Sequence, residues 1–371
     1  MVKKSNKAMD ISKFDKNMAI KKADANGLLW HMPYAKPFKL SGFYWFDQDK
    51  IYRRFPVKPE FSLPKGVDWL SWCTAGGQIK FRTDSGKISL KVKLRDAGAM
   101  DHMAQTGISG FDLYVGEPGK EFFYSVTRFP CDATEFNYEL FNCNVRKLRN
   151  FTINFPLYNG VNEVMIGLQN DAKIESPPAY RTNKPVVFYG TSITQGGCAS
   201  RPGSCSTNIL SRRLNMPFIN LGFSGSGRGE PDVARNIALI EKPAMLVLDY
   251  EANCINLEDT LPEFISILRA THKKVPILVI SKNRFGQEAL DCGDKHDGKE
   301  TREKCKAMQC KLVKKLKKEG DKNIYFLDGS KLLGKDYWEC TVDNCHPTDF
   351  GFFRMADGIE PVIKKILFKK K

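Results

Sequence analysis

The sequence of 371 residues lacks any run of about 18 apolar residues, the length that a membrane-spanning helix requires. It therefore predicts no membrane span. The first residues, MVKKSNKAMDISKF, also lack the apolar core of a secretory signal. We expect a cytoplasmic protein, or a periplasmic or secreted one if a signal was removed before this sequence begins, and the residues do not decide between these locations.

Paired CxxC motifs are absent, although the chain has 11 cysteines. Without such pairs nothing in the spacing favours a zinc site, and we expect no metal. Two pairs of cysteines lie close in sequence, Cys198 with Cys205 and Cys340 with Cys345. Each pair is compatible with a short disulfide loop and equally with two free thiols.

Histidine is scarce, with five residues, whereas positive charge is abundant, with a net charge of +16. A basic chain raises the question of nucleic acid. The lysines, however, gather in VKKSNK, CKLVKKLKKEG and KKILFKKK, which is typical of tails and solvated helix faces, and no nucleic-acid-binding motif accompanies them. We expect no nucleic-acid partner, while an acidic substrate stays compatible with the charge. The oligomeric state is not indicated.

A chain of this length suits two domains. After a tail at residues 1–26, apolar residues alternate with polar ones over residues 27–175. The segment GQIKFRTDSGKISLKVKLRD predicts a β-hairpin around TDSG, GFDLYVGEPGKEFFYSVTRF predicts one around GEPG, and NFTINFPLYNGVNEVMIGL predicts one around YNG. Short strands separated by turns predict an antiparallel sandwich or jelly roll.

The rhythm changes after a segment rich in proline and polar residues, AKIESPPAYRTNKP, within which we place a linker at 176–184. Over 185–371, short apolar runs alternate with amphipathic stretches. The runs PVVFYG, PFINLGF, AMLVLDY, VPILVIS and NIYFLDG each predict a buried parallel strand, and the stretches between them predict helices. This pattern predicts a doubly wound α/β domain, whose ligands bind at the carboxyl ends of the strands.

Ser192 follows the first of these strands in GTSITQG, which places it at the carboxyl end of the strand. A serine in that position can simply cap the next helix. Near the C-terminus, TVDNCHPTDFG holds His346, with Asp343 three positions before it. In a turn, Asp343 can orient the imidazole of His346, which can then act as the base that a serine nucleophile needs.

Two other loops fall at successive strand ends. The glycine-rich NLGFSGSGRG follows the second strand, and DYEANC, with the amide of Asn253, follows the third. Backbone N–H groups and an amide are the donors that stabilise an oxyanion. Taken together, these loops predict acyl transfer by a serine.

This combination of motifs resembles the SGNH (GDSL-type) hydrolase superfamily. The segment GISGFDLYVGE resembles the GxDLY motif of a β-domain that precedes such hydrolases in a bacterial subfamily. The resemblance implies a flavodoxin-like three-layer α/β domain with a parallel sheet, preceded by an antiparallel β-sandwich of jelly-roll type. It also implies a catalytic triad of Ser192, His346 and Asp343 and an oxyanion hole made by Ser192, Gly225 and Asn253. Asn253 departs from the family's GxND pattern, because this chain has EANC.

The expected activity is a serine esterase that removes acetyl or other small acyl groups from a carbohydrate, with a small-molecule or glycan ester as its partner and no cofactor. The alternatives are a lipid-directed esterase or lysophospholipase, and a noncatalytic glycan-binding protein. Arg201, in CASRPGSC, is a candidate for substrate binding and equally for pairing with an acid. His102 and Trp30 could also reach the cleft, although a core or surface role suits each of them better.

Overall fold

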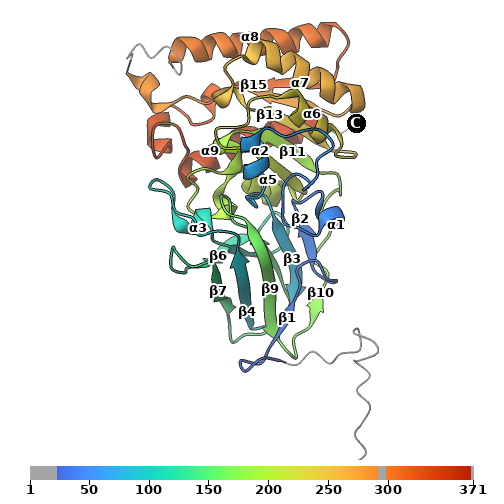
Figure 1. Ribbon diagram of the computed structural model, residues 1–371, viewed down its shortest axis with the longest axis vertical. Helices are drawn as coiled ribbons and strands as arrows, with labels where there is room; N and C mark the ends of the chain where they lie inside the picture. The colour runs from blue at the N-terminus through green and yellow to red at the C-terminus, as the bar shows by residue number, and fades with distance from the viewer. Residues whose placement is uncertain (1–22, 291–297, 369–371) are drawn as a thin grey trace, which may run out of the picture.

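The computed structural model describes residues 23–290 and 298–368. Most of the predicted tail (1–26) and the last lysines of KKILFKKK therefore lie outside the described residues. Within the described part, two antiparallel sheets form one half of the molecule and a parallel sheet covered by helices forms the other (Figure 1). No helix in this part is both long and apolar enough to cross a bilayer.

The N-terminal half is a sandwich of two antiparallel sheets, as the alternating pattern predicted. Both sheets turn their apolar faces toward a shared core that includes Phe81, Leu90, Phe151 and Ile166. The first sheet has the strand order β1 (Leu28–His31), β9 (Val161–Gln169), β4 (Lys87–Leu94) and β7 (Glu135–Asn142). The second has the order β10 (Ile174–Glu175), β3 (Gln78–Thr83), β8 (Arg149–Asn154), β5 (Asp112–Val115) and β6 (Phe122–Val126), and β2 (Lys39–Ser41) also pairs with β3.

Two of the three predicted hairpins are wrong. Only β5 and β6, which flank GEPG, pair with each other. β3 pairs with β2, β8 and β10, whereas β4 pairs with β7 and β9, so TDSG carries the chain from one sheet to the other. The YNG turn does the same between β8 and β9. The alternation of apolar residues shows that each strand has one buried face. In a sandwich, two strands that follow each other in sequence can belong to opposite sheets and still bury these faces in the same core.

The C-terminal half contains a five-stranded parallel sheet, and each strand coincides with a predicted apolar run. The order is β12 (Phe218–Gly222), β11 (Val186–Gly190), β13 (Met245–Asp249), β14 (Ile277–Ile280) and β15 (Ile324–Leu327). Every strand pair in this sheet is parallel. The sheet is thus flavodoxin-like, with the first strand of the domain next to the third.

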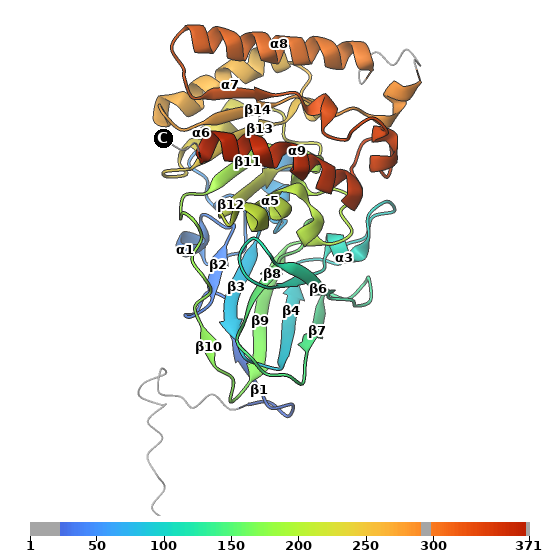
Figure 2. The same cartoon turned by 180° about the vertical axis from the view of Figure 1, so that it is seen from behind.

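Helices cover both faces of this sheet (Figures 1 and 2). Phe188 of β11 faces a core formed with α5 (Ser206–Leu214) and α9 (Asp349–Leu367), whereas Tyr189 faces a core formed with α6 (Pro231–Ala238), α7 (Leu257–Thr271) and α8 (Lys299–Lys318). Successive strand residues point to opposite faces, so strands packed on both sides are apolar throughout. The result is a three-layer α/β domain.

The apolar residues of α8 recur at helical spacing and share one buried face. Val313 lies in the core, and Cys305, Met308, Leu312 and Leu316 pack against it. Gly320, just beyond the helix, has a φ of +107°, a conformation that glycine adopts at little cost at a helix end.

The segment between β2 and β3 leaves the sandwich and packs on the α/β domain. It holds two short helices, α1 (Phe46–Asp49) and α2 (Lys65–Leu70). Phe55, Val67 and Leu70 are buried in the same core as α6 and α7. In Figure 1, α2 lies among the elements of the α/β domain although it precedes most of the sandwich in sequence. A segment of the N-terminal half therefore contributes side chains to the core of the α/β domain.

A carboxyl group is buried at the end of the central strand β13. Desolvation raises the pKa of Asp249 to about 7, and the charge of Glu251 adds to this effect, whereas a hydrogen bond from the Thr194 hydroxyl (3.3 Å) opposes it. Between the ordinary pKa of 3.8 and about 7, the folded protein holds a proton that the unfolded chain releases. Stability should therefore fall as the pH rises through this window.

We predict that Asp249→Asn removes this loss because an amide does not ionise. At pH 8 the melting temperature should rise by about 4 to 8 °C, the scale of about 2 kcal/mol in a domain of this size. Near pH 4 the variant and the wild type should have the same melting temperature. Thermal unfolding between pH 4 and 8 measures this difference, with the exposed Asp132→Asn as a control. A gain that is the same at every pH would contradict the assignment.

Candidate active site

Ser192 begins the short helix α4 (Ser192–Gln195) directly after β11. The residue that caps this helix is Thr191, whose hydroxyl accepts a hydrogen bond from the backbone N–H of Ile193 (3.3 Å). The Ser192 hydroxyl therefore has no capping role and is available for other contacts. At Gly190, a Cβ atom would lie 2.1 Å from the Thr194 hydroxyl, so the turn into α4 requires glycine there.

The structure brings Ser192, His346 and Asp343 together, although 154 residues separate the serine from the histidine. Ser192 Oγ lies 2.8 Å from His346 Nε2, and His346 Nδ1 lies 2.7 Å from Asp343 Oδ2. Both are hydrogen-bond distances. The two contacts form a continuous chain from alcohol to imidazole to carboxylate.

Asp343 is held by the turn that carries His346. Its Oδ1 accepts the backbone N–H groups of Cys345 (3.1 Å) and His346 (2.7 Å), and Asn344 between them has a φ of +69°. Partial desolvation raises the pKa of Asp343, but the hydrogen bonds from the His346 backbone and imidazole outweigh it and leave the pKa below its ordinary value. The carboxylate therefore stays ionised and can orient the imidazole.

The glycine-rich loop after β12 lies against the segment that carries Ser192. The Phe223 N–H donates to the Gly190 carbonyl (3.0 Å), and the Ser224 N–H donates to Gln195 Oε1 (3.0 Å). Gly225 follows with a φ of +64°, and a Cβ atom there would meet nothing within 4 Å. Its backbone thus borders open space beside the serine loop.

A buried arginine lies under the same loop. Arg54, from the segment between β2 and β3, is fully buried, and its guanidinium donates to the carbonyls of Gly222 and Leu70. It also lies over the Phe223 ring, with 4.5 Å to the ring centroid. Burial lowers its pKa to about 10, so it stays charged at neutral pH. The sandwich half thereby helps to fix the start of the glycine-rich loop.

Asn253 ends a short 3₁₀ turn, η4 (Glu251–Asn253), that follows β13. Its Nδ2 lies 3.4 Å from the carbonyl oxygen of Phe223, a long hydrogen bond that puts the amide beside the glycine-rich loop. The turn itself is anchored by Glu251, whose carboxylate accepts the Lys282 N–H (2.7 Å) and Gln309 Nε2 (2.6 Å). The second and third loops of the predicted oxyanion hole therefore touch.

Arg201 is engaged with the sandwich, which favours the structural alternative. Its guanidinium lies 3.6 Å from the buried carboxylate of Asp112, donates to the Tyr114 hydroxyl and stacks on the Phe123 ring at 3.9 Å. Asp112 also accepts the Gly203 N–H (2.6 Å). Asp112 and Tyr114 belong to GFDLY, so this motif forms one of the contacts between the two halves. These contacts account for the Arg201 side chain, and its part in substrate binding stays a prediction.

Two residues that contact the serine loop were not predicted from the sequence. The Tyr158 hydroxyl, from the turn between β8 and β9, donates to the Ser192 carbonyl oxygen (3.3 Å). Gln195 is fully buried, and its Nε2 donates to the Leu157 carbonyl (3.1 Å) while its Oε1 holds Ser224. The position of Gln195, three residues after the serine in the short motif GTSITQG, could have indicated its role. A glutamine buried at that position must hydrogen-bond to neighbouring loops. Tyr158 belongs to the YNG turn, and no sequence pattern indicated its contact with Ser192.

His102 and Trp30 occupy different places. The His102 ring centroid is 5.7 Å from that of His346, so the loop that precedes α3 (Gln105–Ile108) reaches the site. Trp30, on β1, donates to Asp24 (2.8 Å) and packs on Gly167 within the sandwich. Cys198, Cys205 and Cys340 have free thiols, so neither of the two short disulfide loops is formed.

Comparisons with known proteins agree with this architecture. The model of the GDSL-like lipase/acylhydrolase family matches residues 183–364, and a model of the N-terminus of SGNH hydrolase-type esterases (GxDLY) matches residues 28–174. A search of the curated proteins found no match.

Solved structures share the fold over nearly the whole chain. One described as a GDSL-like lipase from Bacteroides ovatus ATCC 8483 is 29% identical, with a TM-score of 0.82, and the match covers 92% of this chain and 99% of that one. A salicylyl-acyltransferase from a tetracycline biosynthetic pathway is 17% identical (TM-score 0.70; 92% and 99% covered). A family two carbohydrate esterase from Cellvibrio japonicus is 12% identical (TM-score 0.59; 92% and 98% covered). At these lower identities the last two show a common fold alone.

The two family models together span both halves of the molecule, and the loops that follow β11, β12 and β13 leave the parallel sheet at one edge. The chain belongs to the GDSL-like lipase/acylhydrolase family, in the group that carries a GxDLY domain at its N-terminus, and it is a serine ester hydrolase.

Proposed function

We propose that this protein removes acetyl or other small acyl groups from a carbohydrate, with Ser192, His346 and Asp343 as its catalytic triad. The observation that carries the proposal is the pair of contacts at His346, 2.8 Å from Nε2 to the Ser192 hydroxyl and 2.7 Å from Nδ1 to the Asp343 carboxylate. A nucleophile, a base and a group that orients the base are the three parts that acyl transfer by serine requires.

The reaction begins when Ser192 Oγ attacks the ester carbonyl carbon and His346 Nε2 accepts the hydroxyl proton. Asp343 holds Nδ1–H and stabilises the imidazolium that forms. When the tetrahedral intermediate collapses, the C–O bond to the sugar breaks and His346 returns its proton to the sugar oxygen. Water, deprotonated by His346, then attacks the acyl-enzyme and releases the acid and the free serine.

We assign the oxyanion hole to the N–H groups of Ser192 and Gly225 and to the side-chain amide of Asn253. The open space beside Gly225 and the contact of Asn253 with the Phe223 carbonyl support this assignment. Donors that are fixed before reaction stabilise the charge as it develops, without any cost of reorganisation at that moment. The anchors at Gln195, Arg54 and Glu251 keep these loops in place.

A glycan substrate is supported by the position of the sandwich. Tyr158 contacts the Ser192 backbone, and the His102 ring lies 5.7 Å from that of His346, so we expect a polymer that approaches the serine to meet the N-terminal half as well. Solved family two carbohydrate esterases have this fold, and one of them, from Clostridium thermocellum, is a complex with cellohexaose (14% identity, TM-score 0.54). We therefore favour a saccharide ester over a lipid.

Replacing Ser192 with alanine should reduce acetyl-ester turnover at least ~10³-fold, because the nucleophile is lost. The variant should fold normally and should no longer react with a fluorophosphonate probe that labels the wild type. The exposed serine of α7 supplies a matched control, and Ser266→Ala should keep full activity. Retained activity in Ser192→Ala would move the chemistry to another residue.

Replacing Asn253 with alanine should lower kcat by about 10²- to 10³-fold with little change in KM, the effect of losing one oxyanion donor. Steady-state kinetics on p-nitrophenyl acetate measures both constants. Asn256→Ala, an exposed amide three positions further on, should have nearly wild-type kinetics. If both variants behave alike, EANC does not supply the third donor.

A substrate panel tests the acyl group and the carrier together. We expect release of acetate from acetylated oligosaccharides, and p-nitrophenyl esters should be hydrolysed more slowly as the acyl chain lengthens. A preference for long chains would instead favour the lipid-directed esterase or lysophospholipase. No turnover of any ester, together with no fluorophosphonate labelling but measurable glycan binding, would favour the noncatalytic glycan-binding protein.

A further inference from the structure

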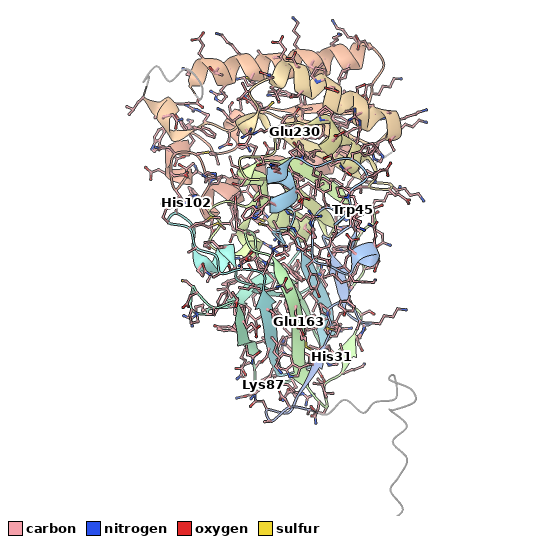
Figure 3. The ribbon with its side chains drawn as sticks, in the orientation of Figure 1. His31, Trp45, Lys87, His102, Glu163 and Glu230 are labelled. Atoms are coloured by element: carbon pink, nitrogen blue, oxygen red, sulfur yellow. The ribbon has the colours of Figure 1, made fainter. Side chains whose placement is uncertain are left out.

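Three side chains that can bind a metal ion converge at the edge of the proposed active site. His102, Cys198 and His346 each offer one ligand atom, and these atoms all lie within 4.8 Å of one another. They come from three segments that are distant in sequence: the loop before α3, the loop after α4 and the loop before α9. Figure 3 shows His102 at the level where the sandwich meets the α/β domain.

We propose that these three residues form an inhibitory site for a borderline-soft divalent cation such as Zn²⁺. Two imidazole nitrogens and one thiolate are a ligand set that zinc prefers. The proposal is about binding to the chain itself, and only its consequence for activity rests on the proposed function.

Both histidines already have the second contact that metal-bound histidines usually make. His102 Nδ1 lies 3.0 Å from Asp101 Oδ1, and His346 Nδ1 lies 2.7 Å from Asp343 Oδ2. A carboxylate at Nδ1 fixes the ring and leaves Nε2 to face a metal. The arrangement occurs at both histidines, which come from different domains.

The distances can close with a small movement. Zn–N bonds of about 2.0 to 2.1 Å and Zn–S bonds of about 2.3 Å place neighbouring tetrahedral ligands about 3.3 to 3.7 Å apart. Atoms that now lie up to 4.8 Å apart must therefore approach by up to about 1.5 Å. The His102 side chain is 37% exposed and can make this movement, whereas Cys198 is buried on a loop whose φ at that residue is +70°. Water or the Ser192 hydroxyl can complete the four-coordinate shell.

Coordination would stop the proposed reaction because His346 has no spare nitrogen. Nε2 is hydrogen-bonded to the Ser192 hydroxyl and Nδ1 to the Asp343 carboxylate. A metal on either nitrogen would therefore break the triad. Binding also replaces the Cys198 thiol proton, which goes to solvent, and no electron is transferred. Because the thiol must lose its proton to bind the metal, binding should weaken as the pH falls.

Zinc titration of the full chain tests the inhibitory effect. Micromolar Zn²⁺ should inhibit hydrolysis of p-nitrophenyl acetate, and a chelator should restore it. Cys198→Ser and His102→Gln should keep basal activity within about twofold and raise the inhibitory Zn²⁺ concentration at least about 10-fold, the lower end of the effect of altering a metal site. Cys131→Ser, an exposed cysteine elsewhere, should remain as sensitive as the wild type. Equal sensitivity of all four proteins would overturn the site.

Cadmium binding supplies a readout that does not need activity. In the Ser192→Ala background, Cd²⁺ should produce a thiolate-to-metal absorption band that Cys198→Ser removes, His102→Gln weakens and Cys131→Ser retains. A band unaffected by Cys198→Ser would also overturn the site. If the wild type hydrolyses no ester while this band behaves as expected, the metal site stands and the proposed function alone fails.

Discussion

The parallel direction of the five strands in the C-terminal sheet is the constraint on which the rest of the structure depends. Because β11, β12 and β13 run the same way, the loops that follow them emerge at one edge. Ser192 after β11, the glycine-rich loop after β12 and Asn253 after β13 all lie at that edge. His346, on the loop before α9, completes the group from the far end of the chain.

The edge is rigid because its loops are tied to one another and to the sandwich. Gln195 links the serine helix to the glycine-rich loop, and the buried Arg54 holds the start of that loop from the opposite domain. Asp112, through Gly203 and Arg201, ties the segment after α4 to β5. Asp112 is fully buried, so removing Arg201 would leave its carboxylate without a charged partner. This pair therefore favours one arrangement of the two domains. The sandwich is thus a structural part of the site and more than an appended module.

Most of the fold followed from the periodicity of the sequence. The five apolar runs became five parallel strands, and α8 buries the face that its apolar spacing indicated. The hairpins around TDSG and YNG were wrong for a reason that periodicity cannot supply. Alternation reports which side of a strand is buried, but the partner of the strand is chosen by the packing of two sheets. Motif spacing and the family resemblance predicted a site made of Ser192, His346, Asp343, Gly225 and Asn253, and they left Arg201 between two roles.

The sequence by itself determined the fold class, the family and the residue types at the strand ends, because these depend on local pattern and on short motifs. Only the tertiary structure decided which distant groups meet. It set Arg201 against Asp112, Tyr158 against the Ser192 backbone, and His102 beside Cys198 and His346. Contacts between residues that are far apart along the chain depend on how whole layers pack, and no local pattern of side chains encodes that distance.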